Sequence, residues 1–153
     1  MSDMLATTVD KFTFRVPTDR LFSPEGLWVL WLQDLAVGHV RLGLGDYLQQ
    51  HSGDVAFAEG MPVGTMIKVG DDVGMIETVK ASLSLLSPVE GTVVQVNPLL
   101  KSTPEVINQD PYGDGWLVVI EVADWELQKS RLLAAEAYFV QMKQQAEDEA
   151  KAT

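Results

Sequence analysis

Lys80 stands at the centre of the segment MIETVKASLS, residues 75–84, and its amine is one group in the chain that could carry covalent chemistry. The chain has no cysteine, which excludes disulfides, thiolate metal sites and a cysteine nucleophile. Its two histidines, His39 and His51, are too few and too isolated to predict a zinc site. Any sulfur chemistry must therefore come from an attached group or a partner.

The segments on both sides of Lys80 alternate as β-strands do. Before the lysine Met75, Glu77 and Val79 alternate with Ile76 and Thr78, and after it Leu83 and Leu85 alternate with Ser82 and Ser84. Two similar motifs, GTMIKVG at 64–70 and GTVVQVN at 91–97, flank the pair and predict equivalent strands. We therefore expect Lys80 in the turn of a β-hairpin. By position alone, such a lysine is most simply a solvated surface residue.

The rest of the chain predicts a mainly β protein, a barrel or sandwich, in one domain over residues 11–141. Turn residues separate short apolar segments: GLWVLWLQ, VGHVRLG, GTMIKVG, VGMIETV, GTVVQVN and GWLVVIEVA. A short helix is expected over 46–53, with Asp46 as its cap and Gly53 closing it. A C-terminal helix is expected after Asp124, on the helical spacing of Leu132, Leu133, Ala137, Phe139 and Val140. Residues 1–10 are expected to be flexible and residues 142–153 to form a polar tail.

The composition indicates a protein that works with other proteins. With 11 basic and 22 acidic residues the net charge is −11, which repels nucleic acid and anionic lipid and favours partners with basic docking surfaces. No apolar run approaches the ~20 residues that cross a bilayer. The start, MSDMLATTVDKF, lacks the apolar stretch of a signal peptide. We expect a cytoplasmic protein that binds neither nucleic acid nor membrane.

Longer motifs around Lys80 narrow the range of possible functions. The text GDDVGMIETVKASLSLLSPVEGTVVQVN, followed by NQDPYGDGWLVVIEV, resembles the lipoyl-carrying H protein of the glycine cleavage system. The similarity runs from about Phe22 to Tyr138 and includes SGDVAF, the SPVEG turn and DPYGDGWL. The resemblance implies a barrel-sandwich hybrid of two small antiparallel sheets. It also implies a non-catalytic carrier with lipoate in amide linkage on Lys80.

The resemblance gives the neighbours of Lys80 a role as well. Glu77, Val79 and Ala81 flank the amine as in H proteins, which implies that they are read by a lipoate ligase or lipoyltransferase and surround the arm. A solvent-facing strand acid is an equally good explanation for Glu77. Biotin carriers resemble this hairpin too, but their lysine lies between methionines, whereas here Val79 and Ala81 flank it.

Two features of the glycine cleavage pattern are absent. In FSPEGLWV, Trp28 matches a tryptophan of the family, but Gly26 and Leu27 replace the histidine and glutamate that precede it, and Ser84 replaces an acid. A cationic aminomethyl group would lose charge-assisted partners worth about 1.5–3 kcal/mol each. The departures favour the lipoate-binding proteins of the heterodisulfide-reductase-like sulfur oxidation system, in which the arm carries a sulfur intermediate.

The alternative is a glycine cleavage H protein that carries the aminomethyl group of glycine. Partners implied by the resemblance are the enzymes of one of these two pathways and dihydrolipoamide dehydrogenase. An unmodified binding module on the same scaffold remains a further alternative.

No catalytic pair or triad supports an enzyme. Asp110 and Asp114 lack the spacing of a calcium loop, and GLGD at 43–46 lacks the third glycine of a dinucleotide site.

Overall fold

The computed structural model describes residues 3–32 and 38–152. The strands are β1 (Met4–Val9), β2 (Phe12–Pro17), β3 (Leu21–Phe22), β4 (Leu27–Trp31), β5 (His39–Leu44), β6 (Val55–Gly60), β7 (Met66–Ile67), β8 (Asp72–Thr78), β9 (Ser82–Leu86), β10 (Gly91–Val96) and β11 (Val118–Glu121). The helices are α1 (Asp46–Ser52), α2 (Leu99–Ser102), α3 (Val106–Gln109), α4 (Trp125–Lys129) and α5 (Ala135–Ala152). Among the described residues, no helix is long and apolar enough to span a membrane.

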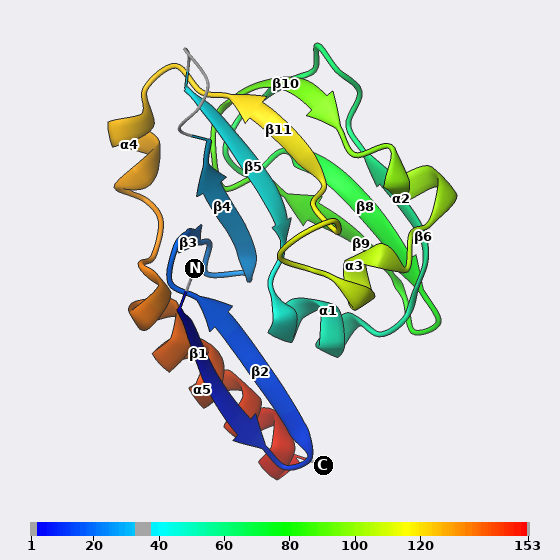
Figure 1. Ribbon diagram of the computed structural model, residues 1–153, viewed down its shortest axis with the longest axis vertical. Helices are drawn as coiled ribbons and strands as arrows, with labels where there is room; N and C mark the ends of the chain where they lie inside the picture. Colours follow the sequence, from blue (N-terminus) through cyan, green and yellow to red (C-terminus); the bar gives the residue numbers. More distant parts are fainter. Residues whose placement is uncertain (1–2, 33–37, 153) are drawn as a thin grey trace.

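Two antiparallel sheets form the larger part of the molecule (Figure 1). One has six strands in the order β3-β4-β5-β11-β10-β7, and the other has three in the order β6-β8-β9. A separate hairpin of β1 and β2 lies against α5 beside them. The predicted mainly β fold, with two antiparallel sheets, a short internal helix and a C-terminal helix, is confirmed.

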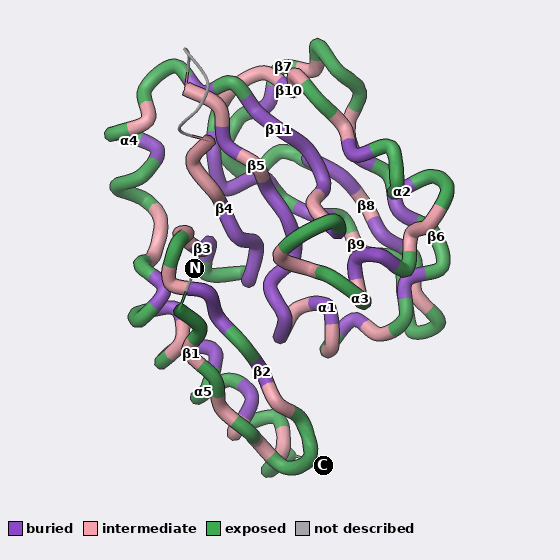
Figure 2. The backbone as a smooth tube through the Cα atoms, in the orientation of Figure 1, coloured by how far each residue is buried: buried purple, intermediate pink, exposed green. Residues whose placement is uncertain are grey.

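The apolar faces of both sheets meet in one core, which appears as the buried stretches of β5, β8 and β11 in Figure 2. Val40, Leu42 and Leu44 alternate along β5 and are fully buried, as is Ile76 in β8. Burying side chains of this kind stabilises a fold by about 1.5–3 kcal/mol each. This core fixes the register of β8, and therefore fixes which residues lie at its end.

The two similar motifs lie in neighbouring strands. Residues of β7 and β10 pair directly, Gly91 with Ile67 and Thr92 with Met66. The hairpin β8–β9 that connects them belongs to the three-stranded sheet, where Glu77 pairs with Ser82. The chain therefore leaves one sheet, makes a hairpin in the other and returns.

The N-terminal segment is a strand instead of the predicted flexible end. β1 pairs with β2 over six positions, from Met4 opposite Pro17 to Val9 opposite Phe12. Along β1 exposed and half-buried residues alternate, and Leu5 and Val9 pack on the cluster that includes α5. The prediction for residues 1–10 is therefore wrong over residues 4–9, because this short alternation finds a distant apolar partner.

The C-terminal helix is longer than expected and buries a different face. It continues to Ala152, so the predicted polar tail over 142–153 is wrong for residues 142–152. Its buried face consists of Ala135, Tyr138, Met142 and Ala146, whereas Val140 is 69% exposed. The second hydrophobic cluster therefore crosses the predicted boundary at 141: Phe14, Val16, Phe22, Trp28, Tyr47, Ala135, Tyr138, Met142 and Ala146.

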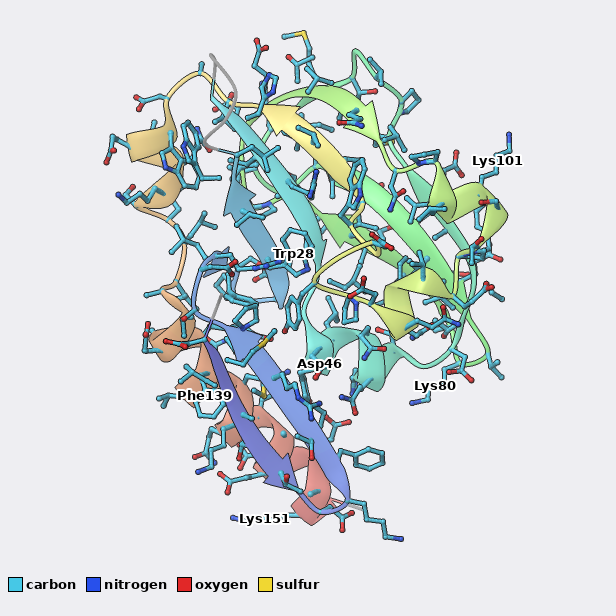
Figure 3. The ribbon with its side chains drawn as sticks, viewed as in Figure 1. Trp28, Asp46, Lys80, Lys101, Phe139 and Lys151 are labelled. Carbon is cyan, nitrogen blue, oxygen red and sulfur yellow. The ribbon has the colours of Figure 1, made fainter. Side chains whose placement is uncertain are left out.

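Helix α1 begins and ends close to the predicted residues, but its first carboxylate has another role. Gly45 is the N-cap, and no side chain caps the helix there. The carboxylate of Asp46 accepts hydrogen bonds from the backbone N of Arg15, at 2.9 Å, and from Nε2 of Gln49, at 2.9 Å. Asp46 therefore ties α1 to β2 (Figure 3). Gly53 closes the helix as predicted, with φ of 94°.

Candidate functional site

Lys80 lies in a three-residue loop between the end of β8 at Thr78 and the start of β9 at Ser82. The backbone N of Thr78 donates to the carbonyl of Ala81 at 2.9 Å. The hydroxyl oxygen of Thr78 accepts hydrogen bonds from the backbone N of Lys80, at 3.2 Å, and of Ala81, at 3.3 Å. A threonine that bonds to the backbone two and three residues onward fixes a tight turn. Thr78 therefore holds the loop with Lys80 at its tip.

The side chain of Lys80 extends over the end of α1 (Figure 3). Its methylene carbons pass Gly53, where a Cβ would lie 3.5 Å from Cε of Lys80. Its Nζ donates to the carbonyl oxygen of His51 at 3.1 Å. A cation is favoured at the C-terminal end of a helix, where carbonyls lack partners. The amine is exposed and held at a defined place by one hydrogen bond.

The other predicted site residues surround the amine on the surface. Glu77, Val79 and Ala81 are all exposed, and Val79 is 90% exposed. Phe57, which pairs with Glu77 across β6 and β8, is 45% exposed. An apolar side chain as exposed as that of Val79 is available for contact with a partner protein. The roles of Glu77, Val79 and Ala81 in ligase recognition stay predictions.

A cavity of about 200 Å³ opens beside Lys80. Lys80 itself lines it, together with Phe12 and Phe14 of β2, Tyr47 of α1 and Glu149 of α5. Phe14 and Tyr47 make an edge-to-face pair with ring centroids 5.2 Å apart. The cavity is therefore formed where the N-terminal hairpin, α1 and the end of α5 meet.

Polar groups close one side of this cavity. Oε1 of Glu149 lies 2.7 Å from Nδ1 of His51, and the hydroxyl of Tyr47 donates to the other carboxylate oxygen of Glu149. Burial, with the Glu149 carboxylate as the smaller cause, raises the pKa of Tyr47 well above its usual range. The phenol therefore stays protonated and joins α1 to the end of α5.

Leu27 and Ser84, two of the three positions that depart from the glycine cleavage pattern, differ in their surroundings. Leu27 is 2% exposed and packs in the main core, whereas Ser84 is exposed on β9. Glu25, the acid nearest to Leu27 in sequence, is exposed. Leu27 is therefore a core residue with no carboxylate to offer an amine.

The other polar motifs have structural roles. In DPYGDG, the carboxylate of Asp110 accepts from the backbone N of Asp114 at 2.8 Å, and the carbonyl of Pro111 accepts from Nε1 of Trp28 at 2.9 Å. His39 lies 3.3 Å from Glu121. Within residues 3–32 and 38–152, no group of three His, Asp or Glu residues could hold a metal ion.

The sequence matches the family model described as glycine cleavage H-protein over residues 22–145. The chain belongs to this family. Members of the family are carriers with a lipoate attached covalently to a lysine, so the predictions of a lipoyl cofactor and of a non-catalytic carrier are confirmed. The match begins after β1 and β2 and ends within α5.

Individual relatives agree with the family. The glycine cleavage system H protein of Coprothermobacter proteolyticus is 43% identical over 117 residues, covering 76% of this chain and 89% of the relative. That of Oceanobacillus iheyensis is 40% identical over 123 residues, covering 80% and 94%. The crystal structure of the Mycobacterium marinum H protein superposes with a TM-score of 0.69 at 30% identity, covering 82% and 98%.

The cavity beside Lys80 was not foreseen from the sequence. Tyr47 and Glu149 are 102 positions apart, and Phe12 lies close to the predicted start of the domain at residue 11. Alternation along residues 4–9 was the available signal for the hairpin that forms one wall. Alternation alone does not say which helix a hairpin will cover.

Proposed function

We propose that this chain is a lipoyl carrier protein whose lipoate is attached to Nζ of Lys80. The observation that carries the proposal is the exposed amine of Lys80 in the β8–β9 loop of a chain that belongs to the H-protein family. The dithiolane of an attached lipoate would supply the redox and group-transfer chemistry that a chain without cysteine lacks.

The residues of the loop suit this role. Thr78 fixes the turn, and exposure leaves Nζ within reach of a ligase. On amide formation Nζ gives up two of its three protons and bonds to the acyl carbon, from which the activating group departs. The residue becomes neutral but keeps one N–H. The three-stranded sheet holds the root of the arm in place, and tethering raises the local concentration of the dithiolane at each partner.

For the pathway, we propose glycine cleavage as the first candidate. The relatives described above carry the name glycine cleavage system H protein, at up to 43% identity. The partners would be the glycine cleavage enzymes, dihydrolipoamide dehydrogenase and a lipoate ligase or lipoyltransferase. The place of action would be the cytoplasm. The cargo would be the aminomethyl group of glycine.

A specific observation favours a second candidate, the carrier of a sulfur intermediate in the heterodisulfide-reductase-like system. Leu27 is buried in the apolar core and Ser84 is uncharged, so neither position offers an acid to a cationic amine. A sulfur-bearing arm needs no such acid. The partners would then be the heterodisulfide-reductase-like sulfur oxidation enzymes.

Attachment is tested by intact mass after incubation with a lipoate ligase, lipoate and ATP. The wild-type chain is expected to gain one lipoyl group and Lys80→Arg none. Lys101→Arg, which alters another exposed lysine on α2, is the matched control and is expected to gain one group. Modification of Lys80→Arg would show that another lysine carries the arm.

The pathway is tested by reconstitution of the lipoylated protein with glycine decarboxylase and aminomethyltransferase. Glycine-dependent release of carbon dioxide that requires lipoylated wild-type protein supports glycine cleavage. Absence of turnover, in an assay in which a known H protein works, supports the sulfur pathway. Each outcome selects one of the two candidates.

A further inference from the structure

We propose that a second cavity, on the side of the molecule away from Lys80, binds an arginine side chain of a partner protein. The cavity has a volume of about 200 Å³, and we call it the tryptophan cavity. It lies between the β2–β3 turn, β4, α4 and the first turn of α5. Figure 1 shows α4 at one edge of the molecule, whereas Lys80 is labelled near the opposite edge in Figure 3. The lining residues used in the argument are Asp19, Arg20, Trp31, Trp125 and Glu136.

Hydrogen bonds fix the segments that form the walls of the tryptophan cavity. The backbone N of Glu90 donates to Oε1 of the buried Gln128 at 2.9 Å, which ties α4 to the turn before β10. The backbone N of Leu133 donates to the carbonyl of Phe22 at 2.8 Å, and the backbone N of Phe22 donates in return at 2.9 Å. The segment between α4 and α5 is therefore held beside β3. Walls that are fixed before binding lower the cost of ordering a site around its ligand.

The rings of Trp31 and Trp125 give the cavity a flat aromatic surface. Their centroids are 5.0 Å apart, and the two ring planes differ by 23°. Both residues pack against the main core and remain only half-buried, so part of each ring is accessible. Tryptophan attracts a cation over its face more strongly than the other aromatic side chains do, and a planar guanidinium stacks on such a ring. The surface therefore suits a flat cationic group.

The charged groups of the lining leave one negative charge without a counterion. Arg20 pairs with Asp19, at 2.8 Å between Nε and Oδ1, and its guanidinium also lies 4.7 Å from the ring of Trp28. The exposed Glu136 has no salt bridge within the part of the chain that the structure describes. A cation that enters the tryptophan cavity therefore meets an unpaired carboxylate beside the two indole rings.

An arginine presented by another protein fits this lining better than a lysine does. The N–H donors of a guanidinium bond to a carboxylate while its plane stacks on an aromatic ring, whereas an ammonium is a strongly hydrated point charge. The net charge of −11 favours partners with basic surfaces. The volume is below the roughly 300–1,000 Å³ of pockets that enclose drug-sized ligands, so it suits a single side chain. A partner held here leaves the surroundings of Lys80 open.

The test uses full-length, unmodified ¹⁵N-labelled protein and the peptide acetyl-Gly-Arg-Gly-amide. A second peptide carries citrulline, which is neutral and has nearly the same shape, in place of arginine. The indole N–H signals are assigned with Trp31→Phe and Trp125→Phe. The arginine peptide is expected to shift the signals of Trp31 and Trp125, with half-saturation at roughly 1–10 mM, as for a ligand of one side chain. The signal of Trp116, which lies outside the lining, is expected to stay in place, and the citrulline peptide is expected to shift none.

Two charge variants separate the cavity from the general attraction of an acidic protein for a basic peptide. Glu136→Gln keeps the shape of the side chain and is expected to weaken binding about fivefold. Glu59→Gln changes the net charge by the same amount on the exposed side of β6, outside the lining, and is expected to bind like the wild type. If Glu136 served only the first turn of α5, its replacement would leave peptide binding unchanged.

The docking of a whole partner is tested with the lipoylated protein in the partner assay that it supports. Glu136→Gln is expected to raise the KM for the carrier about threefold and to leave kcat unchanged, because the contact is remote from the arm. Glu59→Gln is expected to change neither constant. An unchanged KM for Glu136→Gln would overturn the docking of a partner at this site.

The outcomes of the titration distinguish this inference from the proposed function. Equal shifts with the arginine and citrulline peptides, or equal affinities of Glu136→Gln and Glu59→Gln, would overturn the arginine site. Indole shifts that depend on protein concentration without peptide would show that a second copy of the chain occupies the cavity, which would also overturn it. Because the titrated protein is unmodified, a failure of Lys80 to accept lipoate would remove the proposed function and leave the arginine site standing.

Discussion

At the scale of single residues, Lys80 is distinguished by the groups that present it. The hydroxyl oxygen of Thr78 accepts hydrogen bonds from the backbone N of Lys80 and of Ala81, and Gly53 lies beside the lysine stem. His51 supplies the carbonyl that Nζ contacts. A lysine in a flexible loop would sample many positions, whereas this one starts from a fixed root.

Removing the hydroxyl of Thr78 tests this presentation. Thr78→Val keeps the β-branched shape but loses the acceptor of two backbone N–H groups, so we expect the free energy of unfolding to fall by about 1 kcal/mol. We also expect slower lipoylation, because the loop no longer holds one shape. Urea unfolding and a lipoylation time course measure the two effects.

Thr65→Val is the matched control. The hydroxyl of Thr65 donates to the carbonyl of Pro62 at 2.6 Å in another exposed turn. A similar loss of stability without a change in lipoylation rate is expected. Equal rates for both variants and the wild type would contradict a role for Thr78 in presentation.

The sequence was sufficient to predict the turn but not the contacts of the lysine. Alternation on both sides of Lys80 requires a turn between two strands, and that pattern is local. The hydrogen bond to His51 joins residues 29 positions apart. It depends on where α1 packs relative to β8, which no local pattern specifies.

At the scale of elements, α5 and the N-terminal hairpin stabilise each other. Tyr138 and Met142 of α5 and Phe14 and Val16 of β2 are buried in the same hydrophobic cluster. The apolar residues Ala137 and Val140 led to the wrong face because they are exposed. Alanines and a methionine, which are weak signals of burial, form much of the true face.

Truncating the buried face of α5 tests this packing. Met142 is fully buried, so Met142→Ala is expected to lower the free energy of unfolding by about 2–5 kcal/mol. Val140→Ala, on the exposed side, is expected to change it by less than about 0.5 kcal/mol. Denaturant unfolding of the two variants measures the difference. A larger loss for Val140→Ala would mean that the face of α5 is the one expected from the sequence.

At the scale of the whole molecule, buried phenols connect the hairpin, the sheets and the helices. The hydroxyl of Tyr112 donates to the carbonyl of Arg15 at 2.5 Å and accepts from the backbone N of Asp46 at 2.8 Å. Burial is the largest cause of the raised pKa values of Tyr47, Tyr112 and Tyr138. These phenols remain protonated in the folded protein at pH values that ionise the unfolded chain.

Alkaline pH is therefore expected to destabilise the fold. An unfolded tyrosine ionises near pH 10, so above about pH 10 the folded state binds more protons and the free energy of unfolding decreases as pH rises. Below that pH these tyrosines contribute no pH dependence. Tyr112→Phe is expected to reduce the alkaline slope by about 1.4 kcal/mol per pH unit. Urea unfolding between pH 8 and pH 11 measures it, and an unchanged slope in the variant would contradict the account.

The fold class was predictable from strand alternation and turn residues, and the lysine from its motif. The cavity beside Lys80 was not, because its lining joins residues 9–14 and 146–150 to α1 through contacts between residues far apart in the sequence. The segments that precede and follow the family match at residues 22–145 have a role that depends on where they pack. Both segments line the cavity beside Lys80, so the N-terminal hairpin and the end of α5 form part of the surroundings of the lysine.

The most direct measurement is peptide mass spectrometry of the protein isolated from a host that makes lipoate. The account predicts one lipoyl group, found on the peptide that contains Lys80, with the other lysines unmodified. A fully unmodified Lys80 in a host whose other lipoyl proteins are loaded, or a lipoyl group on another residue, would contradict it.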